Sequence, residues 1–250
     1  MYARQPTTVS LWSSTTTFRT VVYLVSALLV GAIGTQLIVS FVTRSPPAMV
    51  AWHLFNFDGD STVPTWVASV LWLSCSIGIV LHIALLRQQP ATKVAPQWYL
   101  LAAVSTILSI DEVARIHESV GGTGIKMLLG DFGGAFYWGW VIAGMAFTAV
   151  IGAICLPFLW ALPPNTRYRF MTAGFVFLSG ALGCEMIAAS IHETEGAGAP
   201  YRLVTMLEET LEFCGVGLFL VAIHQHLEQQ LPVLSTARGG RIQTSADNSL

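Results

Sequence analysis

Six stretches of this sequence are apolar and long enough to cross a lipid bilayer, or nearly so, and this limits the possible folds more than any other feature. A hydrocarbon core about 30 Å thick needs about 20 apolar residues in a helix. A helix also satisfies its own backbone hydrogen bonds, as lipid requires. The sequence therefore predicts an all-α bundle of six transmembrane helices, at residues 20–42, 63–86, 98–110, 136–162, 170–191 and 201–223.

The composition supports a membrane protein. Of 250 residues, 54% are hydrophobic and 10% are charged, whereas about a quarter of the residues of an average soluble domain are charged. The formal net charge of -2 offers no basic surface, so nucleic acid is not an expected partner. The predicted parts are a cytoplasmic segment at 1–19, a transmembrane domain at 20–228 and a disordered polar tail at 229–250.

The distribution of Lys and Arg between the loops predicts the orientation of the bundle. With the N-terminus in the cytoplasm, eight basic residues fall on the inner side and three on the outer side. They are Arg4, Arg19, Arg87, Lys93, Arg167, Arg169, Arg238 and Arg241 inside, and Arg44, Lys126 and Arg202 outside. We therefore expect both termini in the cytoplasm and the bundle in a plasma membrane.

Three of the six predicted helices carry acidic residues near their outer ends. With a rise of about 1.5 Å per residue, Asp111 and Glu208 lie about 10 Å, and Glu185 about 8 Å, below the outer surface. Glu212 lies about 16 Å below that surface by the same arithmetic. The third, fifth and sixth predicted helices are therefore expected to bring carboxylates together in the outer third of the bilayer.

This region holds far more negative than positive charge. One base, Arg115, accompanies seven acids: Asp111, Glu112, Glu118, Glu185, Glu208, Glu209 and Glu212. Even on a lenient scale, one ionised acid at the centre of a span costs about 2.5 to 3.5 kcal/mol. Either several of these acids are protonated or cations are bound. We favour a bound metal ion because histidines accompany the carboxylates.

Residues that share a helix face define the expected metal ligands. His192 follows Glu185 by close to two turns, Glu212 follows Glu208 by one turn, and Asp111 shares a stripe with Arg115 and Glu118. His117 joins the face of Asp111 only if the helix is irregular there. The expected ligands are Asp111, Glu118, Glu185, His192, Glu208 and Glu212, with Glu112, Arg115, His117 and Glu209 as alternate ligands or as residues that hold the ligands.

The ligand types leave the metal open. Carboxylates with one or two imidazoles from facing helices are typical of dinuclear iron or manganese sites in helix bundles. The usual Glu-x-x-His motif is missing from these helices, so zinc stays an alternative. Iron would favour an oxidoreductase, and zinc a hydrolase that uses metal-bound hydroxide. In either case the depth of the site suits a lipid or another membrane-soluble substrate.

Two other functions use the same acids. A transporter or sensor would bind a proton or a divalent cation at the cluster, but such a path should continue to the cytoplasm. Below Asp111 and Glu212 the helices are almost wholly apolar, with Ser105, Thr106 and Gln36 as the few polar candidates. A structural subunit would instead keep its acids protonated, as hydrogen-bonding groups between helices.

A short motif occurs twice in the sequence. The segment IHESVGG at 116–122 matches IHETEGAG at 191–198, and each follows an acid by six or seven residues. Each copy ends a predicted helix that runs outward and leads into one that runs back. The match indicates a tandem pair of helical hairpins, made of predicted helices three and four and of five and six.

The acidic motifs resemble those of a known group of proteins. Ser109, Asp111, Glu112, His117 and Glu118 form the pattern S-x-D-E-x4-H-E. Glu185, His192 and the segment LEETLEF at 207–213 follow. In these features the chain resembles uncharacterised bacterial multi-pass membrane proteins, over the third to sixth predicted helices. The resemblance implies a membrane bundle and no particular reaction.

Overall fold

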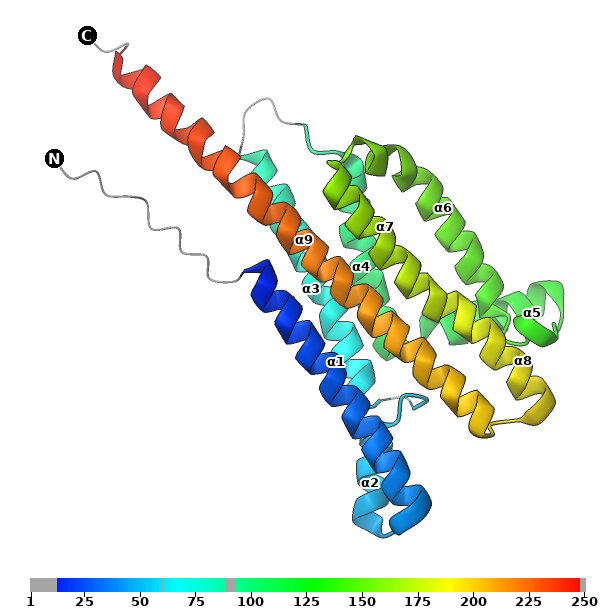
Figure 1. Ribbon diagram of the computed structural model, residues 1–250. Coiled ribbons are helices and arrows are strands. Elements are labelled where there is room, and N and C mark those ends of the chain that lie inside the picture. Colours follow the sequence, from blue (N-terminus) through cyan, green and yellow to red (C-terminus); the bar gives the residue numbers. More distant parts are fainter. Residues whose placement is uncertain (1–12, 60, 89–92, 248–250) are drawn as a thin grey trace.

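The computed structural model describes residues 13–59, 61–88 and 93–247, with side chains up to residue 230. All regular secondary structure in these residues is helical (Figure 1). Four helical segments are long and apolar enough to cross a membrane: Ser14–Val42, Val63–Arg87, Trp140–Ala161 and Pro164–Glu195. The chain is therefore an all-α protein with membrane-like helices, as the sequence predicts.

The first part of the chain forms two long helices joined by a short one. Helix α1 (Ser14–Leu37) starts at Ser13, whose side chain accepts a hydrogen bond from the backbone N–H of Thr16. It continues through a π-helical turn, η1 (Ile38–Val42). Helix α2 (Pro46–Phe55) lies in the loop before α3 (Val63–Arg87), which Thr62 caps in the same way. The sequence analysis predicts α3 closely but does not include α2.

The middle of the chain contains the first acidic segment. Helix α4 (Pro96–Ala114) is followed by a π-helical segment η2 (His117–Gly122), the short helix α5 (Thr123–Leu129) and a 3-10 turn, η3 (Gly134–Phe136). Helix α6 (Trp140–Ala161) then runs back across the bundle. The predicted segment at 98–110 is thus shorter than α4, because Asp111 and Glu112 belong to the helix rather than ending it.

The last part of the chain contains the other acids. Helix α7 (Pro164–Leu178) passes through a π-helical segment, η4 (Ser179–Cys184), into α8 (Glu185–Glu195). Helix α9 (Ala199–Asp247) follows. It continues through most of the segment 229–250, for which the sequence predicts a disordered tail. Most of the predicted segment 1–19, and residues 248–250 of the tail, lie outside the described residues.

Helix α9 is the central element of the bundle. It packs against α1, α3, α7 and α8, and Figure 1 shows it crossing the molecule between α1 and α7. The core beside it contains Ile79, Phe213 and Ile223, each at most 2% exposed. Because α4 packs mainly on α3, the two acid-bearing helices α4 and α9 are held at a fixed spacing by α3.

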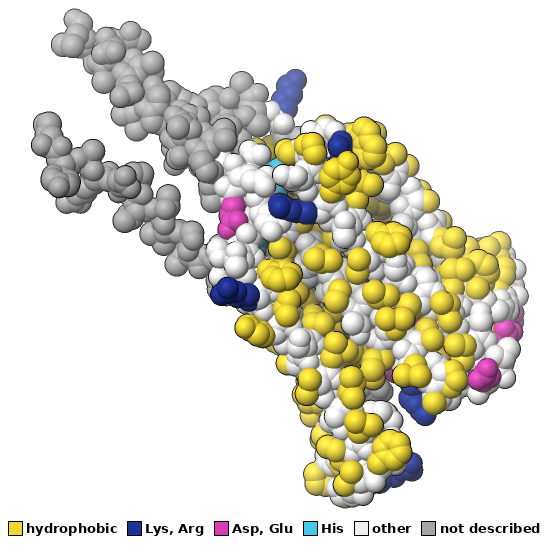
Figure 2. Space-filling view, in the orientation of Figure 1, with side chains coloured by type: hydrophobic (Ala, Val, Ile, Leu, Met, Phe, Trp, Pro, Cys, Tyr) yellow, Lys and Arg dark blue, Asp and Glu magenta, His cyan; other side chains and the backbone are white. Residues whose placement is uncertain are grey.

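The outside of the bundle is apolar. Figure 2 shows hydrophobic side chains over the middle of the visible face and the few charged side chains toward its ends. Val30 on α1 and Phe175 on α7 are 72% and 74% exposed. A surface of this kind is stable in contact with lipid and would aggregate in water.

Candidate functional site

Helix α4 ends abruptly in the middle of the first acidic motif. Arg115 takes the left-handed conformation, with φ 51° and ψ 44°, and the chain then enters the π-helical segment η2. This break turns His117 back toward the end of α4. The irregularity that the sequence analysis requires for His117 is therefore present. The prediction that Asp111, Arg115 and Glu118 lie on one continuous helix face is wrong, because the helix does not extend past Ala114.

Asp111 and His117 form a hydrogen-bonded pair across this break. The backbone N–H of His117 donates to Asp111 Oδ1 at 2.8 Å, and the ring atom Nδ1 lies 2.6 Å from Oδ2. The carboxylate is the acceptor, so Nδ1 carries the proton and Nε2 keeps its lone pair. An imidazole held in this way is suited to bind a metal ion or to accept a proton through Nε2.

Glu118 has a different partner from the other acids. Its carboxylate pairs with the guanidinium of Arg115, and the two side chains are 44% and 42% exposed. One of its oxygens, Oε1, also lies 3.8 Å from His117 Nε2. Glu118 therefore stays at the edge of the acidic region, with its charge compensated by Arg115.

Glu185 is held by Trp140, a residue that the sequence analysis does not include in the site. Glu185 follows the π-helical segment η4 directly and accepts a hydrogen bond of 2.7 Å from the indole Nε1 of Trp140. It also interacts with the carboxyl group of Glu208 on α9. The ring of Trp140 packs on His117, with centroids 4.6 Å apart. Trp140 on α6 thus connects the first acidic motif to the acids of α8 and α9.

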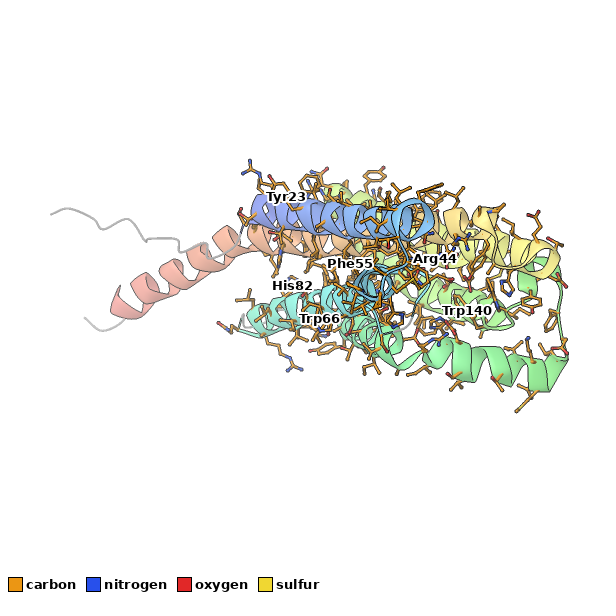
Figure 3. The ribbon with its side chains drawn as sticks, turned by 90° about the horizontal axis from the view of Figure 1, so that it is seen from below. Tyr23, Arg44, Phe55, Trp66, His82 and Trp140 are labelled. Atoms are coloured by element: carbon orange, nitrogen blue, oxygen red, sulfur yellow. The ribbon has the colours of Figure 1, made fainter. Side chains whose placement is uncertain are left out.

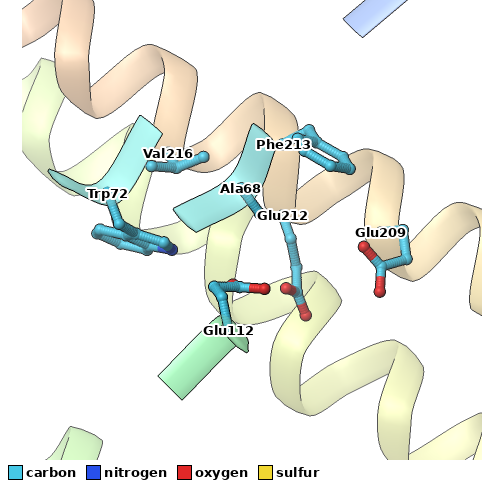
Figure 4. Close-up of a pocket in the computed structure, with 7 residues that line it drawn as sticks. All are labelled: Ala68, Trp72, Glu112, Glu209, Glu212, Phe213 and Val216. Carbon is cyan, nitrogen blue, oxygen red and sulfur yellow. The ribbon is translucent and has the colours of Figure 1, made fainter. Parts of the chain in front are cut away.

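Three acids line a small pocket between α3, α4 and α9. Figure 4 shows Glu112 of α4 and Glu212 of α9 pointing toward one another, with Glu209 one turn before Glu212. Glu212 experiences the charges of Glu209, Glu112 and Glu185. The other lining residues are Ala68, Trp72, Phe213 and Val216. The pocket therefore combines a carboxylate cluster with apolar walls.

Gly180 brings the segment η4 close to this part of α9. A Cβ atom added at Gly180 would lie 2.7 Å from the backbone oxygen of Glu208 and 3.0 Å from Glu212 Cγ. Only glycine permits this approach, because a real Cβ atom does not come so near to a backbone atom. The sequence thus positions Glu208 and Glu212 through a residue that has no side chain.

His192 lies among aromatic rings. The rings of Tyr137, Trp138 and Tyr201 surround it, with centroids 5.7, 5.4 and 5.3 Å away. Its Nδ1 atom is buried and has no hydrogen-bond partner among the described residues. Tyr201 in turn donates a hydrogen bond of 2.7 Å to Asp58 Oδ1. His192 is therefore held by aromatic rings, rather than by a carboxylate.

The structure brings together some of the predicted site residues and separates others. Within the described part of the chain, no three side chains of His, Cys, Asp or Glu are arranged so that they could hold a metal ion. The acids instead form two adjoining groups, namely the pocket acids Glu112, Glu209 and Glu212, and the interacting pair Glu185 and Glu208. The Asp111 and His117 pair adjoins them through Trp140.

Replacing Trp140 by Phe is expected to weaken the link between these groups. The substitution keeps a ring against His117 but removes the indole N–H from Glu185, which leaves a half-buried carboxylate short of a donor. We expect the free energy of unfolding to fall by about 1 to 3 kcal/mol, measured by thermal unfolding in detergent. Trp160→Phe is the control, because Trp160 is 60% exposed. An equal effect of both substitutions would contradict the link.

Comparison with known proteins places most of the chain in one family. The family model described as "Domain of unknown function (DUF8692)" matches residues 18–227. This match includes every acid and histidine of the site. No curated protein and no solved structure matches the chain.

Proposed function

The chain belongs to the DUF8692 family, and we propose that it is an integral membrane protein that binds a metal ion at its buried carboxylates. The observation that supports this is the convergence of Glu112, Glu209 and Glu212 on one pocket, within reach of the charge of Glu185. Ionised acids this close repel one another strongly in a medium of low dielectric constant. A bound cation removes that repulsion.

The chemistry of the donors fits a hard or borderline metal. Glu112, Glu209 and Glu212 would supply carboxylate oxygens after their side chains turn toward a shared ion, and His117 would supply one imidazole nitrogen held by Asp111. The orphaned Nδ1 of His192 marks a second unused donor nearer the surface. Glu118 and His192, which the sequence analysis includes among the ligands, have other contacts, so we exclude them from the proposed core. Iron, manganese and zinc all remain compatible with this donor set.

We propose that the site acts as an enzyme on a lipid or another membrane-soluble substrate. A bound metal would supply either an oxidising centre or an activated water. The apolar walls, Trp72, Phe213 and Val216, would exclude water from the acids and from a bound metal ion. Asp111 fixes the orientation of the His117 ring, and Trp140 holds the Glu185 carboxylate. The reaction is thus an oxidation or a hydrolysis, according to the metal.

We also propose that α4 and α9 cross the membrane with the four apolar segments, which gives six spans. The acid-poor ends of both helices would then lie toward the cytoplasm, with both termini on that side. The two copies of the IHE motif support a tandem hairpin origin. In the present chain the copies differ, because His117 follows a helix break whereas His192 lies inside α8.

A second candidate function is the transfer of a proton or a cation across the bundle. One observation favours it: hydroxyl groups meet in pairs along the contact between α3 and α4. Ser69 Oγ and Ser109 Oγ are 3.1 Å apart, and Ser76 Oγ and Thr106 Oγ1 are 2.8 Å apart. These pairs lie below Glu112, where the sequence indicates few polar groups. They also serve as interhelical hydrogen bonds, which is their ordinary role.

Elemental analysis of the full chain, purified in detergent, tests the first proposal against the second. We expect iron, manganese or zinc at about one or two ions per chain, retained after dialysis against buffer without metal. A chain that folds, yet contains no metal and takes up none when each ion is added, would overturn the metal proposal. Proton uptake by that metal-free chain in vesicles would then support transport.

A further inference from the structure

A second cluster of polar side chains lies at the opposite end of the bundle from the acidic site. It consists of His82 on α3, Trp98 on α4 and His226 on α9, which are 2%, 4% and 4% exposed. Figure 3 shows His82 and Trp140 toward opposite ends of the molecule. The acids of the candidate site take no part in it.

The three rings are in mutual contact. The centroids of His82 and His226 are 4.8 Å apart, and Trp98 lies 4.5 Å from His82 and 5.3 Å from His226. The planes of Trp98 and His226 are within 25° of parallel. Thr166 Oγ1 on α7 lies 3.2 Å from His226 Nδ1. Four helices therefore meet at a pair of adjacent imidazoles, of which His226 is stacked on the indole of Trp98 and His82 meets it edge-on.

The cluster leaves a hydrogen-bonding atom unused. Nδ1 of His82 is buried and has no hydrogen-bond partner among the described residues. A buried polar atom left in this state destabilises the fold, so an apolar residue at position 82 would pack at lower cost. The presence of two imidazoles in an otherwise aromatic core indicates that the pair binds something small that carries positive charge.

We propose that His82 and His226 together bind one proton. A protonated imidazole has two N–H donors. His226 would donate through Nδ1 to the Thr166 hydroxyl, and its positive charge would lie against the face of Trp98, where cation–π attraction favours a cation. Because the two ring centroids are 4.8 Å apart, a charge on one imidazole disfavours a second charge on the other, so the pair takes up one proton rather than two. The charge then joins α3, α4, α7 and α9 at this end of the bundle.

The charged groups on neighbouring elements are engaged elsewhere or exposed. On α9, His224 bonds to Thr17, and Glu228 accepts hydrogen bonds from Ser14. On α3, Arg87 bonds to Tyr99. On α7, Arg167 lies over Trp160 and Tyr168, and Arg169 is exposed. Lys93, which precedes α4, is also exposed. The charge of His226 is accordingly the one that acts on His82 among the described groups.

Trp98 provides a direct reading of this proton, because a protonated imidazole in contact with an indole quenches its fluorescence. The Trp98 signal is the difference between the full chain and Trp98→Phe, both in detergent. On acidification from about pH 8 to about pH 4, a range that includes the titration of histidine, we expect this signal to fall at least about twofold in one step. His82→Gln and His226→Gln should each remove the step, and His53→Gln, at an exposed position on α2, should leave it unchanged.

Thr166→Val is a milder variant for the case in which a histidine variant fails to fold. It removes the acceptor of His226 Nδ1–H and should move the step to lower pH. A Trp98 signal that does not change with pH, or a step that persists in both glutamine variants, would overturn the proposal. Binding of Zn²⁺ to the full chain at micromolar concentration, lost in both glutamine variants, would assign the pair to a metal ion instead.

Discussion

Replacing Glu212 by Gln should remove the bound metal and, at the same time, stabilise the metal-free protein. The amide keeps the shape of the side chain but loses the charge that a metal ion requires. We expect the affinity for metal to fall by more than about tenfold, since even the loss of a supporting group has that effect. In the metal-free chain, the same substitution removes repulsion with Glu209 and Glu112, which should increase the free energy of unfolding by about 1 kcal/mol or more.

Metal titration and thermal unfolding in detergent measure the two effects separately. Glu195→Gln is the matched control, because Glu195 is exposed at the end of α8 and should change neither quantity. The opposite signs separate the metal proposal from a purely structural role. If the acid were a protonated hydrogen-bonding group, Glu212→Gln would leave the free energy of unfolding almost unchanged, and no metal would be found in either protein.

Replacing Gly215 by Ala should destabilise the fold through a clash between two backbones. A Cβ atom at position 215 would lie 2.5 Å from the backbone nitrogen of Phe177 and 2.6 Å from its Cα. Since Phe177 belongs to α7 and its backbone cannot rotate away, α7 and α9 must separate. We expect a net loss of about 1 to 3 kcal/mol in the free energy of unfolding. Thermal unfolding in detergent measures this loss.

Gly174→Ala is the control for Gly215→Ala. Gly174 lies on α7 in the same part of the chain, and an added Cβ atom there meets nothing within 4 Å. Because alanine favours a helix over glycine by about 1 kcal/mol, this variant should be equal to the natural chain or more stable. Destabilisation of both variants to the same degree would mean that the contact of α7 with α9 is not what makes Gly215 necessary.

The fold class and the long helices could be predicted because apolar length is a local property. The predicted segment 63–86 differs from α3 by one residue at one end. Apolar length does not reveal α2 and α5, since each is too short to span a bilayer and lies in a connection between predicted spans. The predicted segment 98–110 is also shorter than α4. A carboxylate in an apolar run suggests the end of a membrane span, unless the neighbouring helices that surround it are known.

The site was less predictable, because its geometry depends on departures from a regular helix. Spacing alone puts Asp111 and Glu118 on one helix face. The left-handed conformation of Arg115 ends the helix, however, and Asp111 forms its hydrogen bond with His117 instead. Spacing also pairs Glu185 with His192, whereas the rings that surround His192 come from the loop between η3 and α6 and from α9. Trp140 carries no charge, and its role requires knowledge of which helix faces Glu185.

The π-helical segment η4 makes chain length as important to this site as side-chain chemistry. A π turn contains about one residue more than an α turn, so η4 acts as a one-residue insertion immediately before Glu185. Deleting a single residue from 179–184 would let α7 and α8 join as a regular helix. That change would rotate Glu185 by about 100° around the helix axis, away from Trp140 and Glu208, although every acid and histidine of the sequence would still be present.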